Sequence, residues 1–334
     1  MQNDHVLQLL HRRAALRALG ILAAVVASGT GGGWPAARAA SRTIRVGYQR
    51  YGTLILLKHT GYLEKALALS GVSVAWSEHP AGPQMLEAMA GGAVDFGIVG
   101  EVPPVFAQAA SDRVVYVGHE PPAPTGEAIL VPGNSPIHTL SDLKGHSVAL
   151  NRGSNVHWLL LKALAKGGLT VHDIRSVNLT PSAGRPAFET GRIDAWAIWD
   201  PYLSSAQVTA ATPPRVLATA EGLVPNRQFF VASRSYADDN SGVIKVMLEQ
   251  LQRADAWAEA HKTDAARYLA ADTGLPMAVV EKAVNRLSFG VKPMTPDVVA
   301  EQQQIADAFH AAGLLPASVR VADAVWTAPA AGGR

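Results

Sequence analysis

The chain has 334 residues, of which 48% are hydrophobic and 17% are charged, a composition typical of a globular protein with a well-filled core. This length favours two domains or one large two-lobed unit. The formal net charge is +2, but residues 1–40 hold four arginines and one aspartate, which leaves 25 basic and 26 acidic residues in the remainder. The sequence therefore lacks the basic surface that binds nucleic acid. The absence of cysteine excludes a disulfide scaffold, a thiolate nucleophile, a cysteine-ligated metal site and a lipid-modified cysteine anchor.

The first 40 residues have the pattern of a secretory signal peptide. The basic residues Arg12 and Arg13 precede an apolar run at 18–27, which is too short to cross a hydrocarbon core of about 30 Å as a helix. Ala37-Arg38-Ala39 matches an A-x-A cleavage site. We therefore predict a signal peptide over 1–40, exported through the Sec or the twin-arginine pathway, and a mature chain in the periplasm that is not embedded in a membrane. A short membrane anchor is the alternative interpretation.

The first part of the mature chain alternates between strand and helix patterns. We expect strands at 43–48, 72–78, 94–100 and 114–118, and helices at 54–69 (interrupted by Gly61), 83–90 and 105–110. Pro83 stands in the first turn of its helix, where its missing N–H costs nothing. Strands that alternate with helices at this spacing predict parallel βαβ units.

The second part repeats this alternation and then becomes helical. We expect strands at 127–131, 146–150, 176–179 and 229–232, and helices at 156–166, 183–190, 242–261, 263–271 and 296–312. Two α/β halves followed by a helical tail indicate that the chain crosses to a second lobe, returns, and ends on the first lobe. The candidate crossovers are 127–131 and 226–231.

Two segments of the chain, 88–101 and 187–200, align with each other without gaps. The identical pairs are Ala88/Ala187, Gly92/Gly191 and Asp95/Asp194, and Glu101 matches Asp200. Each copy has the pattern of a helix end, a glycine stop and a short apolar strand that ends in a carboxylate, and proline follows each strand. The repeat predicts two similar lobes with a cleft between them. The alternative is a common helix-to-strand turn that occurs twice by chance.

Two loops directly before helices are candidates for an anion site. They are 79–84 and 151–157, and the N-terminus of a helix offers free N–H groups and a positive dipole end to an anion. Ser154, Asn155 and His157 could add hydrogen bonds, and Gly82 allows close approach of the backbone. Ser154 and Asn155 are equally good helix caps without any ligand. Gln49 follows the first strand, where open α/β sheets bind ligands, and Trp199 offers apolar surface at the cleft or in the core.

Catalytic motifs are absent from the sequence. It contains no G-x-S-x-G elbow, no Walker loop, no G-x-G-x-x-G after a strand and no histidine spacing of a metal site. Glu101 and Asp200 could form a pair of acids across the cleft, but no sugar-binding pattern accompanies them. We therefore expect neither a cofactor nor a metal, and a protein that is not an enzyme.

Six short segments have distinctive sequences. They are Ile-Arg-Val-Gly-Tyr-Gln at 44–49, Pro-Ala-Gly-Pro-Gln-Met-Leu-Glu-Ala at 80–88, Val-Pro-Pro-Val-Phe-Ala-Gln-Ala at 102–109, Val-Tyr-Val-Gly at 115–118, Leu-Ser-Asp-Leu-Lys-Gly at 140–145 and Asp-Ala-Trp-Ala-Ile-Trp-Asp-Pro-Tyr at 194–202. Together they resemble the periplasmic aliphatic-sulfonate-binding proteins of ABC importers, over residues 43–326. The resemblance implies a type II periplasmic-binding-protein fold, with two α/β lobes joined by two hinge strands. Lobe I would comprise 41–128 and 228–334, and lobe II 129–227.

The resemblance also implies a function. The protein would capture an alkanesulfonate and deliver it to an ABC permease and its ATPase subunits, as a monomer and without nucleic acid. The implied sulfonate pocket consists of Gln49, Ala81, Gly82, Ser154, Asn155 and His157. The implied wall residues, which could contact the ligand's tail, are Gly100, Glu101, Trp199 and Asp200. The chain departs from the family in the loop 151–157, where relatives often have serines at 155 and 156, and Val156 removes a possible hydroxyl contact.

Other functions remain open at this point. Relatives of the family bind taurine, nitrate or thiamine precursors. Desulfinases that resemble these binding proteins use a cysteine nucleophile, which this chain lacks. A cytoplasmic sensing domain conflicts with the signal peptide.

Overall fold

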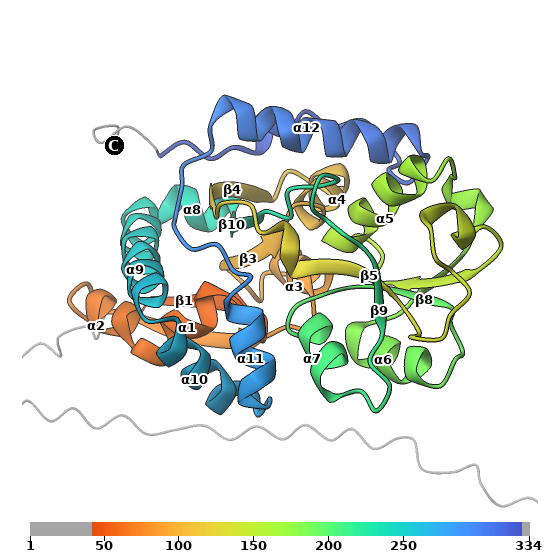
Figure 1. Ribbon diagram of the computed structural model, residues 1–334. Coiled ribbons are helices and arrows are strands. Elements are labelled where there is room, and N and C mark those ends of the chain that lie inside the picture. Colours follow the sequence, from red (N-terminus) through yellow and green to blue (C-terminus); the bar gives the residue numbers. More distant parts are fainter. Residues whose placement is uncertain (1–41, 329–334) are drawn as a thin grey trace, which may run out of the picture. The chain divides into compact units, whose positions relative to one another are not determined.

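Residues 42–328 are described by a computed structural model. The predicted signal peptide, 1–40, lies outside these residues. The described chain is α/β and contains two five-stranded sheets with helices packed against them (Figure 1). The prediction of an α/β fold is confirmed.

The two sheets have the same strand order. The first sheet runs β2 (Val72–Glu78), β1 (Arg42–Tyr48), β3 (Phe96–Gly100), β10 (Gln228–Ser233) and β4 (Val114–His119). The second sheet runs β7 (Arg175–Asn178), β6 (Ser147–Leu150), β8 (Ala195–Trp199), β5 (Glu127–Val131) and β9 (Arg215–Thr219). In each sheet the first three strands are parallel, and the fourth is antiparallel to both of its neighbours. Each sheet with its helices forms one lobe.

The chain passes between the lobes twice. It leaves the first sheet after β4 and enters the second at β5, and it leaves the second sheet after β9 and returns at β10. The antiparallel strand of each sheet is therefore the strand by which the chain enters that lobe. The segments 120–126 and 220–227 carry the crossings, whereas the exact lobe boundaries at 128/129 and 227/228 stay a prediction.

The helices follow the predicted order. They are α1 (Thr53–Thr60), α2 (Tyr62–Ala68), α3 (Gly82–Ala90), α4 (Pro103–Ala110), α5 (Asn155–Lys166), α6 (Pro181–Glu189), α7 (Tyr202–Thr209), α8 (Arg234–Asp239), α9 (Ser241–Ala260), α10 (Lys262–Thr273), α11 (Met277–Val284) and α12 (Pro296–Ala311). The sequence patterns did not predict α7, α8, α11 or β9. These elements have only five to eight residues each, so their periodicity is too short to stand out.

The internal repeat has a structural cause. Asp95 Oδ2 accepts a hydrogen bond from the backbone N–H of Arg45 (2.9 Å), and Asp194 Oδ2 accepts one from the N–H of Ser147 (2.7 Å). Arg45 lies on β1 and Ser147 on β6, which are the equivalent second strands of the two sheets. Each aspartate lies between a glycine turn and a strand. Its side chain connects the start of that strand to the neighbouring parallel strand.

Helix α12 packs against both lobes. Phe309 on α12 contacts Phe106 of α4 in the first lobe, with ring centroids 5.3 Å apart, and His157 of α5 in the second lobe, at 4.9 Å. Figure 1 shows α12 extending from the β4 side of the molecule to α5. After α12, which contacts both lobes, the described chain ends on the first lobe as expected, where Val325 forms a bridge with Tyr116 of β4 and the N–H of Trp326 donates to the carbonyl of Tyr116 (2.9 Å).

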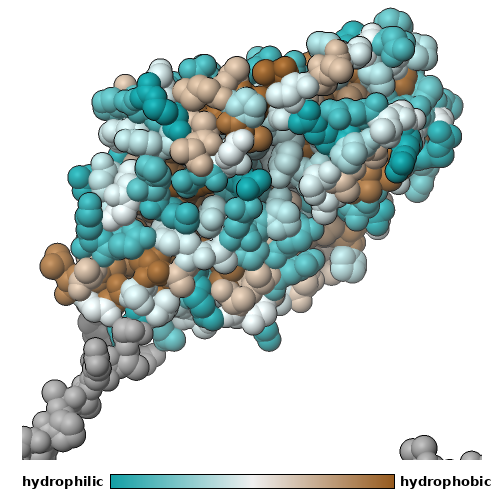
Figure 2. All heavy atoms as spheres, turned by 90° about the horizontal axis from the view of Figure 1, so that it is seen from below, coloured by the Kyte–Doolittle hydropathy of each residue, from teal (hydrophilic) through white to brown (hydrophobic). Residues whose placement is uncertain are grey.

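No helix in residues 42–328 is long and apolar enough to cross a membrane. On the face seen in Figure 2, hydrophobic residues lie in separate groups among hydrophilic ones.

We predict that Asp95→Ala and Asp194→Ala each lower the free energy of unfolding by about 2 kcal/mol, because each leaves a strand N–H without its charged acceptor. Urea unfolding measures this change. The exposed Asp112 provides a control, and Asp112→Ala should change stability by less than about 0.5 kcal/mol. Equal effects of all three substitutions would contradict the role of the repeat.

Candidate functional site

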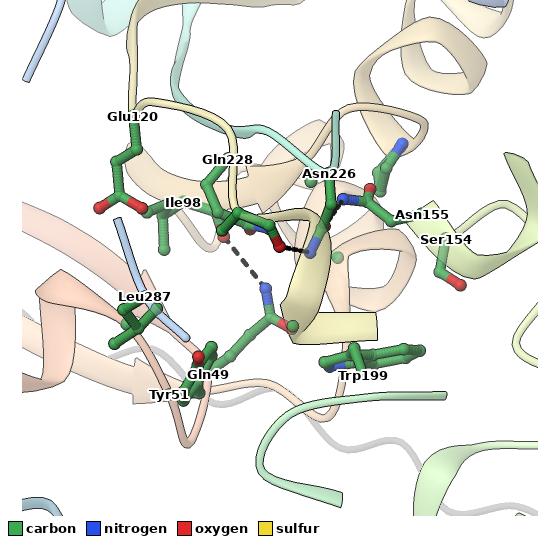
Figure 3. Close-up of a pocket in the computed structure, with 16 residues that line it drawn as sticks. Gln49, Tyr51, Ile98, Glu120, Ser154, Asn155, Trp199, Asn226, Gln228 and Leu287 are labelled. Carbon is green, nitrogen blue, oxygen red and sulfur yellow. Dashed lines mark hydrogen bonds between the residues drawn. The ribbon is translucent and has the colours of Figure 1, made fainter. Parts of the chain in front are cut away.

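A cavity lies where the ends of three strands meet the starts of two helices. Figure 3 shows residues of both lobes around it. Six of the ten predicted site residues line it: Gln49, Gly82, Gly100, Ser154, Asn155 and Trp199. Gln49 follows β1, Gly100 ends β3 and Trp199 ends β8, so the cavity is at the carboxyl ends of strands, where α/β sheets bind ligands.

The Asn155 side chain connects the two lobes beside this cavity. Its Nδ2 donates hydrogen bonds to Asn226 Oδ1 (2.7 Å) and to the carbonyl of Arg227 (3.3 Å) in the returning crossover. Its Oδ1 accepts a bond from the N–H of Val102 (3.4 Å) in the first lobe. A Cβ atom on Gly100 would lie 1.8 Å from Oδ1, so the end of β3 has room for Asn155 only because residue 100 is glycine.

Two helix starts beside the cavity carry free backbone N–H groups. Gly82 begins α3, and Asn155 and Val156 begin α5; in the described chain, their N–H groups have no acceptor. The first turn of a helix leaves such groups unpaired, and they favour an anion. The Ser154 hydroxyl is already used, because it donates to the carbonyl of Asn151 (2.6 Å).

Gly82 has a packing role that the sequence did not predict. A Cβ at this position would approach Pro103 Cγ to 2.8 Å. Glycine here allows α3 to pack against the start of α4, so a larger residue would disturb the first lobe itself.

Four predicted residues do not line the cavity: Ala81, Glu101, His157 and Asp200. Ala81 is buried, and its carbonyl accepts the N–H of Met85. His157 is also buried, packs on Phe309, and accepts a bond from the N–H of Gly153 at Nδ1. Burial lowers the pKa of His157 to about 4, so at neutral pH it carries no charge for an anion.

Glu101 is buried at the returning crossover. Its Oε2 accepts a bond from the N–H of Arg227 (3.1 Å), and its Oε1 has no partner among residues 42–328. Burial raises the pKa of Glu101 to about 8. The fully buried Glu127, at the start of β5, has no described partner for either oxygen, and burial raises its pKa well above the usual range.

Asp200 makes a second connection between the lobes. Arg286 follows α11, and its Nη1 lies 3.1 Å from Asp200 Oδ2 and 3.2 Å from Ser204 Oγ, while its Nη2 donates to Gln207 (2.9 Å). Helix α11 packs with α1 and α10 in the first lobe, whereas Asp200 follows β8 in the second. Burial raises the pKa of Asp200, and Ser204 and Arg286 oppose that shift.

Sequence reasoning missed several cavity residues, among them Tyr51, Glu120, Asn226, Gln228 and Leu287. Asn226 has a left-handed backbone (φ 49°), a conformation that asparagine tolerates better than most residues. Its position at the predicted crossover was the one available signal. In the described chain, no three His, Asp or Glu side chains come together as a metal site would need.

Comparison with known proteins identifies the family of this chain. The model described as NMT1/THI5 like matches residues 52–265. An Escherichia coli (strain K12) protein that is named for the binding of aliphatic sulfonates is 43% identical over 293 residues, which is 87% of this chain and 91% of that protein. The chain belongs to the NMT1/THI5-like family. The resemblance to the aliphatic-sulfonate-binding proteins within it is confirmed.

Two solved structures show what this family member is similar to. The alkanesulfonate-binding protein SsuA from Xanthomonas axonopodis pv. citri, bound to MOPS, is 42% identical, with a TM-score of 0.81 over 85% of this chain and 98% of that one. The periplasmic aliphatic sulphonate binding protein SsuA from Escherichia coli is 41% identical, with a TM-score of 0.79 over 88% and 94%. The predicted periplasmic-binding-protein fold is therefore confirmed.

For this NMT1/THI5-like protein, we predict that Gly100→Ala keeps the lobes from closing, because the new methyl group would overlap Asn155 Oδ1. Ligand affinity should fall at least about tenfold, which corresponds to about 1.4 kcal/mol. Calorimetric titration measures the affinity, and small-angle scattering measures the opening. Gly242→Ala, where a Cβ meets nothing within 4 Å, is the control. Normal binding by Gly100→Ala would refute the contact's role.

We also predict that Glu101→Gln makes stability less dependent on pH. The pKa of Glu101 is raised to about 8 from 4.5, so between these values the folded protein holds a proton that the unfolded chain releases. Wild-type stability therefore falls by up to about 1.4 kcal/mol per pH unit as the pH rises through this window. Glutamine removes that loss. Urea unfolding at several pH values tests this, with the exposed Glu249→Gln as control. Parallel curves for wild type and Glu101→Gln would contradict it.

Proposed function

We propose that this protein captures aliphatic sulfonates in the periplasm and delivers them, as a monomer, to the permease and ATPase subunits of an ABC importer. One observation carries the proposal: unpaired backbone N–H groups from α3 in one lobe and α5 in the other are at a single cavity. A sulfonate presents three oxygens that accept such bonds. The names of the similar proteins, and the MOPS (itself a sulfonate) in one of them, support this class of ligand. The predicted signal peptide supports export.

Binding would proceed by closure of the lobes around the ligand. Since Gly82 and Asn155 belong to different lobes, only the closed protein offers both helix starts to one anion. A ligand that contacts both lobes shifts the population towards the closed state. The proposed sulfonate contacts are the backbone N–H groups of Gly82, Asn155 and Val156. Gln49, Gly100 and Trp199 would form the walls.

The geometry favours binding over catalysis. The described cavity presents backbone donors, side-chain amides, apolar side chains, the Ser154 and Tyr51 hydroxyls and the Glu120 carboxyl, and the buried His157 is neutral and does not line it. No nucleophile with an adjacent base is among the lining residues. We propose that the protein is not an enzyme and uses no cofactor.

A titration distinguishes the possible ligands. We expect ethanesulfonate and butanesulfonate to bind at least about tenfold more tightly than nitrate or sulfate. Each methylene buried beside Ile98 and Trp199 should add about 0.8 kcal/mol until the cavity is filled. Isothermal titration of the purified protein, dialysed into a buffer without sulfonates, measures these affinities. Tight binding of nitrate or of a thiamine-precursor pyrimidine, with none of sulfonates, would overturn the proposal, and product formation on long incubation would indicate an enzyme.

A further inference from the structure

The loop that follows α11 forms part of the cavity wall on the side away from the start of α5. Figure 3 shows Leu287 from this loop, together with Tyr51 and Glu120, on the opposite side of the cavity from Ser154 and Asn155. All five residues line the cavity. Leu287 is 7% exposed, so most of its side chain is in contact with other protein atoms. A ligand whose sulfonate lies at the helix starts extends its tail towards this side.

Most of the groups near Leu287 are polar. Tyr51 donates its hydroxyl hydrogen to a carbonyl of α11 (3.0 Å), and Glu120 Oε1 lies 2.5 Å from Thr53 Oγ1. Gly52, which precedes α1, also lines the cavity. An alkyl tail that covers such polar groups keeps water from them at a cost in free energy, whereas contact with an apolar side chain is favourable. Leu287 is therefore the surface on this side against which the end of an alkyl tail packs well.

Leu287 has a packed core behind it. Its side chain belongs to an apolar cluster with Ile55 and Leu56 of α1 and with Val280 and Val284 of α11, each of which is at most 3% exposed. Protein cores are as dense as organic crystals, so a side chain cannot be pushed into one without moving the helices around it. Leu287 is thus a rigid wall of the cavity.

Polar contacts hold the loop on both sides of Leu287. Arg286 Nη1 lies 3.1 Å from Asp200 Oδ2 in the second lobe. Ser288 Oγ donates to the carbonyl of Pro122 (2.7 Å), in the crossover that leaves the first lobe. A ligand that displaced Leu287 would therefore strain contacts with the second lobe and with the crossover.

We propose that Leu287 sets the longest sulfonate tail that this protein binds, because its side chain ends the space available to the tail when the lobes are together. This inference rests on the sulfonate function proposed above and assigns the tail-length limit within it to one residue. A tail that stops short of Leu287 gains affinity with each added methylene group. A tail that overlaps Leu287 cannot displace it, so the lobes stay apart and the affinity falls.

A series of straight-chain sulfonates, from ethanesulfonate to octanesulfonate, tests the proposal. By calorimetry in a buffer without sulfonates, we expect the affinity of the wild type to rise about fourfold per methylene group up to an optimal tail length. One or two carbon atoms beyond this optimum, the affinity should fall at least about tenfold, because overpacking is costly. The decisive measurement is the position of the optimum rather than the affinity itself.

Variants of Leu287 should move the optimum. Leu287→Ala removes an isopropyl group from the wall, so the optimum should move to tails about two to three carbon atoms longer. Leu287→Val removes less and should move it by about one carbon atom, and it serves as the test if Leu287→Ala fails to fold in a thermal melt. Leu275→Ala is the matched control and should leave the optimum unchanged, since Leu275 packs against the same apolar cluster but does not line the cavity.

Ser288→Ala tests whether the loop contacts hold Leu287 in place. Ser288 does not line the cavity and is a positioning residue, which acts on the ligand only through Leu287. Without its bond to Pro122 the loop can yield to a long tail. The optimum and the affinity for shorter tails should stay, while the fall beyond the optimum should shrink to about threefold or less. An undiminished fall would contradict this positioning role.

The outcomes separate the two proposals. If alkanesulfonates bind without any fall in affinity up to octanesulfonate, or if the optimum stays the same in folded Leu287→Ala and Leu287→Val, the tail-length inference is wrong and the sulfonate function stands. An equal movement of the optimum in Leu275→Ala would also overturn it, because the effect would then come from the apolar cluster in general. If no sulfonate binds to the wild type, the proposed function is wrong and the inference falls with it.

Discussion

The fit of the Asn155 side chain between the lobes is the interaction on which the rest of the site depends. It bonds the crossover at Asn226 and Arg227 and the first lobe at Val102, and it occupies the space that the missing Cβ of Gly100 leaves. Since both Nδ2 hydrogens and Oδ1 are used in these contacts, the side chain has little left for a ligand. Its contribution is to hold the start of α5, with its free N–H groups, against the end of β3. This contact therefore holds the two lobes together directly beside the cavity.

The two carboxylates that the repeat aligns have diverged in their contacts. Glu101 accepts the N–H of Arg227 at the returning crossover, and Asp200 binds Arg286 from the first lobe. Neither residue lines the cavity, but each directly follows a strand whose last residue does line it. Together with α12, whose Phe309 touches both lobes, the Asp200–Arg286 pair gives the closed arrangement contacts on sides away from Asn155. If the lobes close on a ligand as proposed, contacts outside the cavity would also contribute to the balance between the open and closed protein.

Sequence periodicity predicted most of the strands and long helices because each has an apolar pattern of its own. The repeat correctly indicated two similar lobes, since Asp95 and Asp194 each accept a hydrogen bond from the backbone of the neighbouring parallel strand. A local sequence pattern does not identify the contacts of a polar side chain with residues that are distant in the sequence. His157 has the sequence neighbourhood of a ligand residue, yet its ring packs on Phe309, which is about 150 positions away. Glu120 was missed for the same reason, because its partners Thr53 and Asp255 come from α1 and α9.

Three buried glutamates lie at the places where the chain leaves or enters a sheet: Glu101 after β3, Glu120 after β4 and Glu127 at the start of β5. In each case burial raises the pKa, so each carboxyl lowers the stability of the fold at neutral pH relative to an uncharged residue of the same shape. Glutamine would fit these positions at less cost, and natural sequences keep such costs mainly where activity needs them. Glu120 borders the cavity, and the other two border the crossovers about which the lobes would move. These three buried glutamates thus lie beside the cavity or beside the crossovers between the lobes.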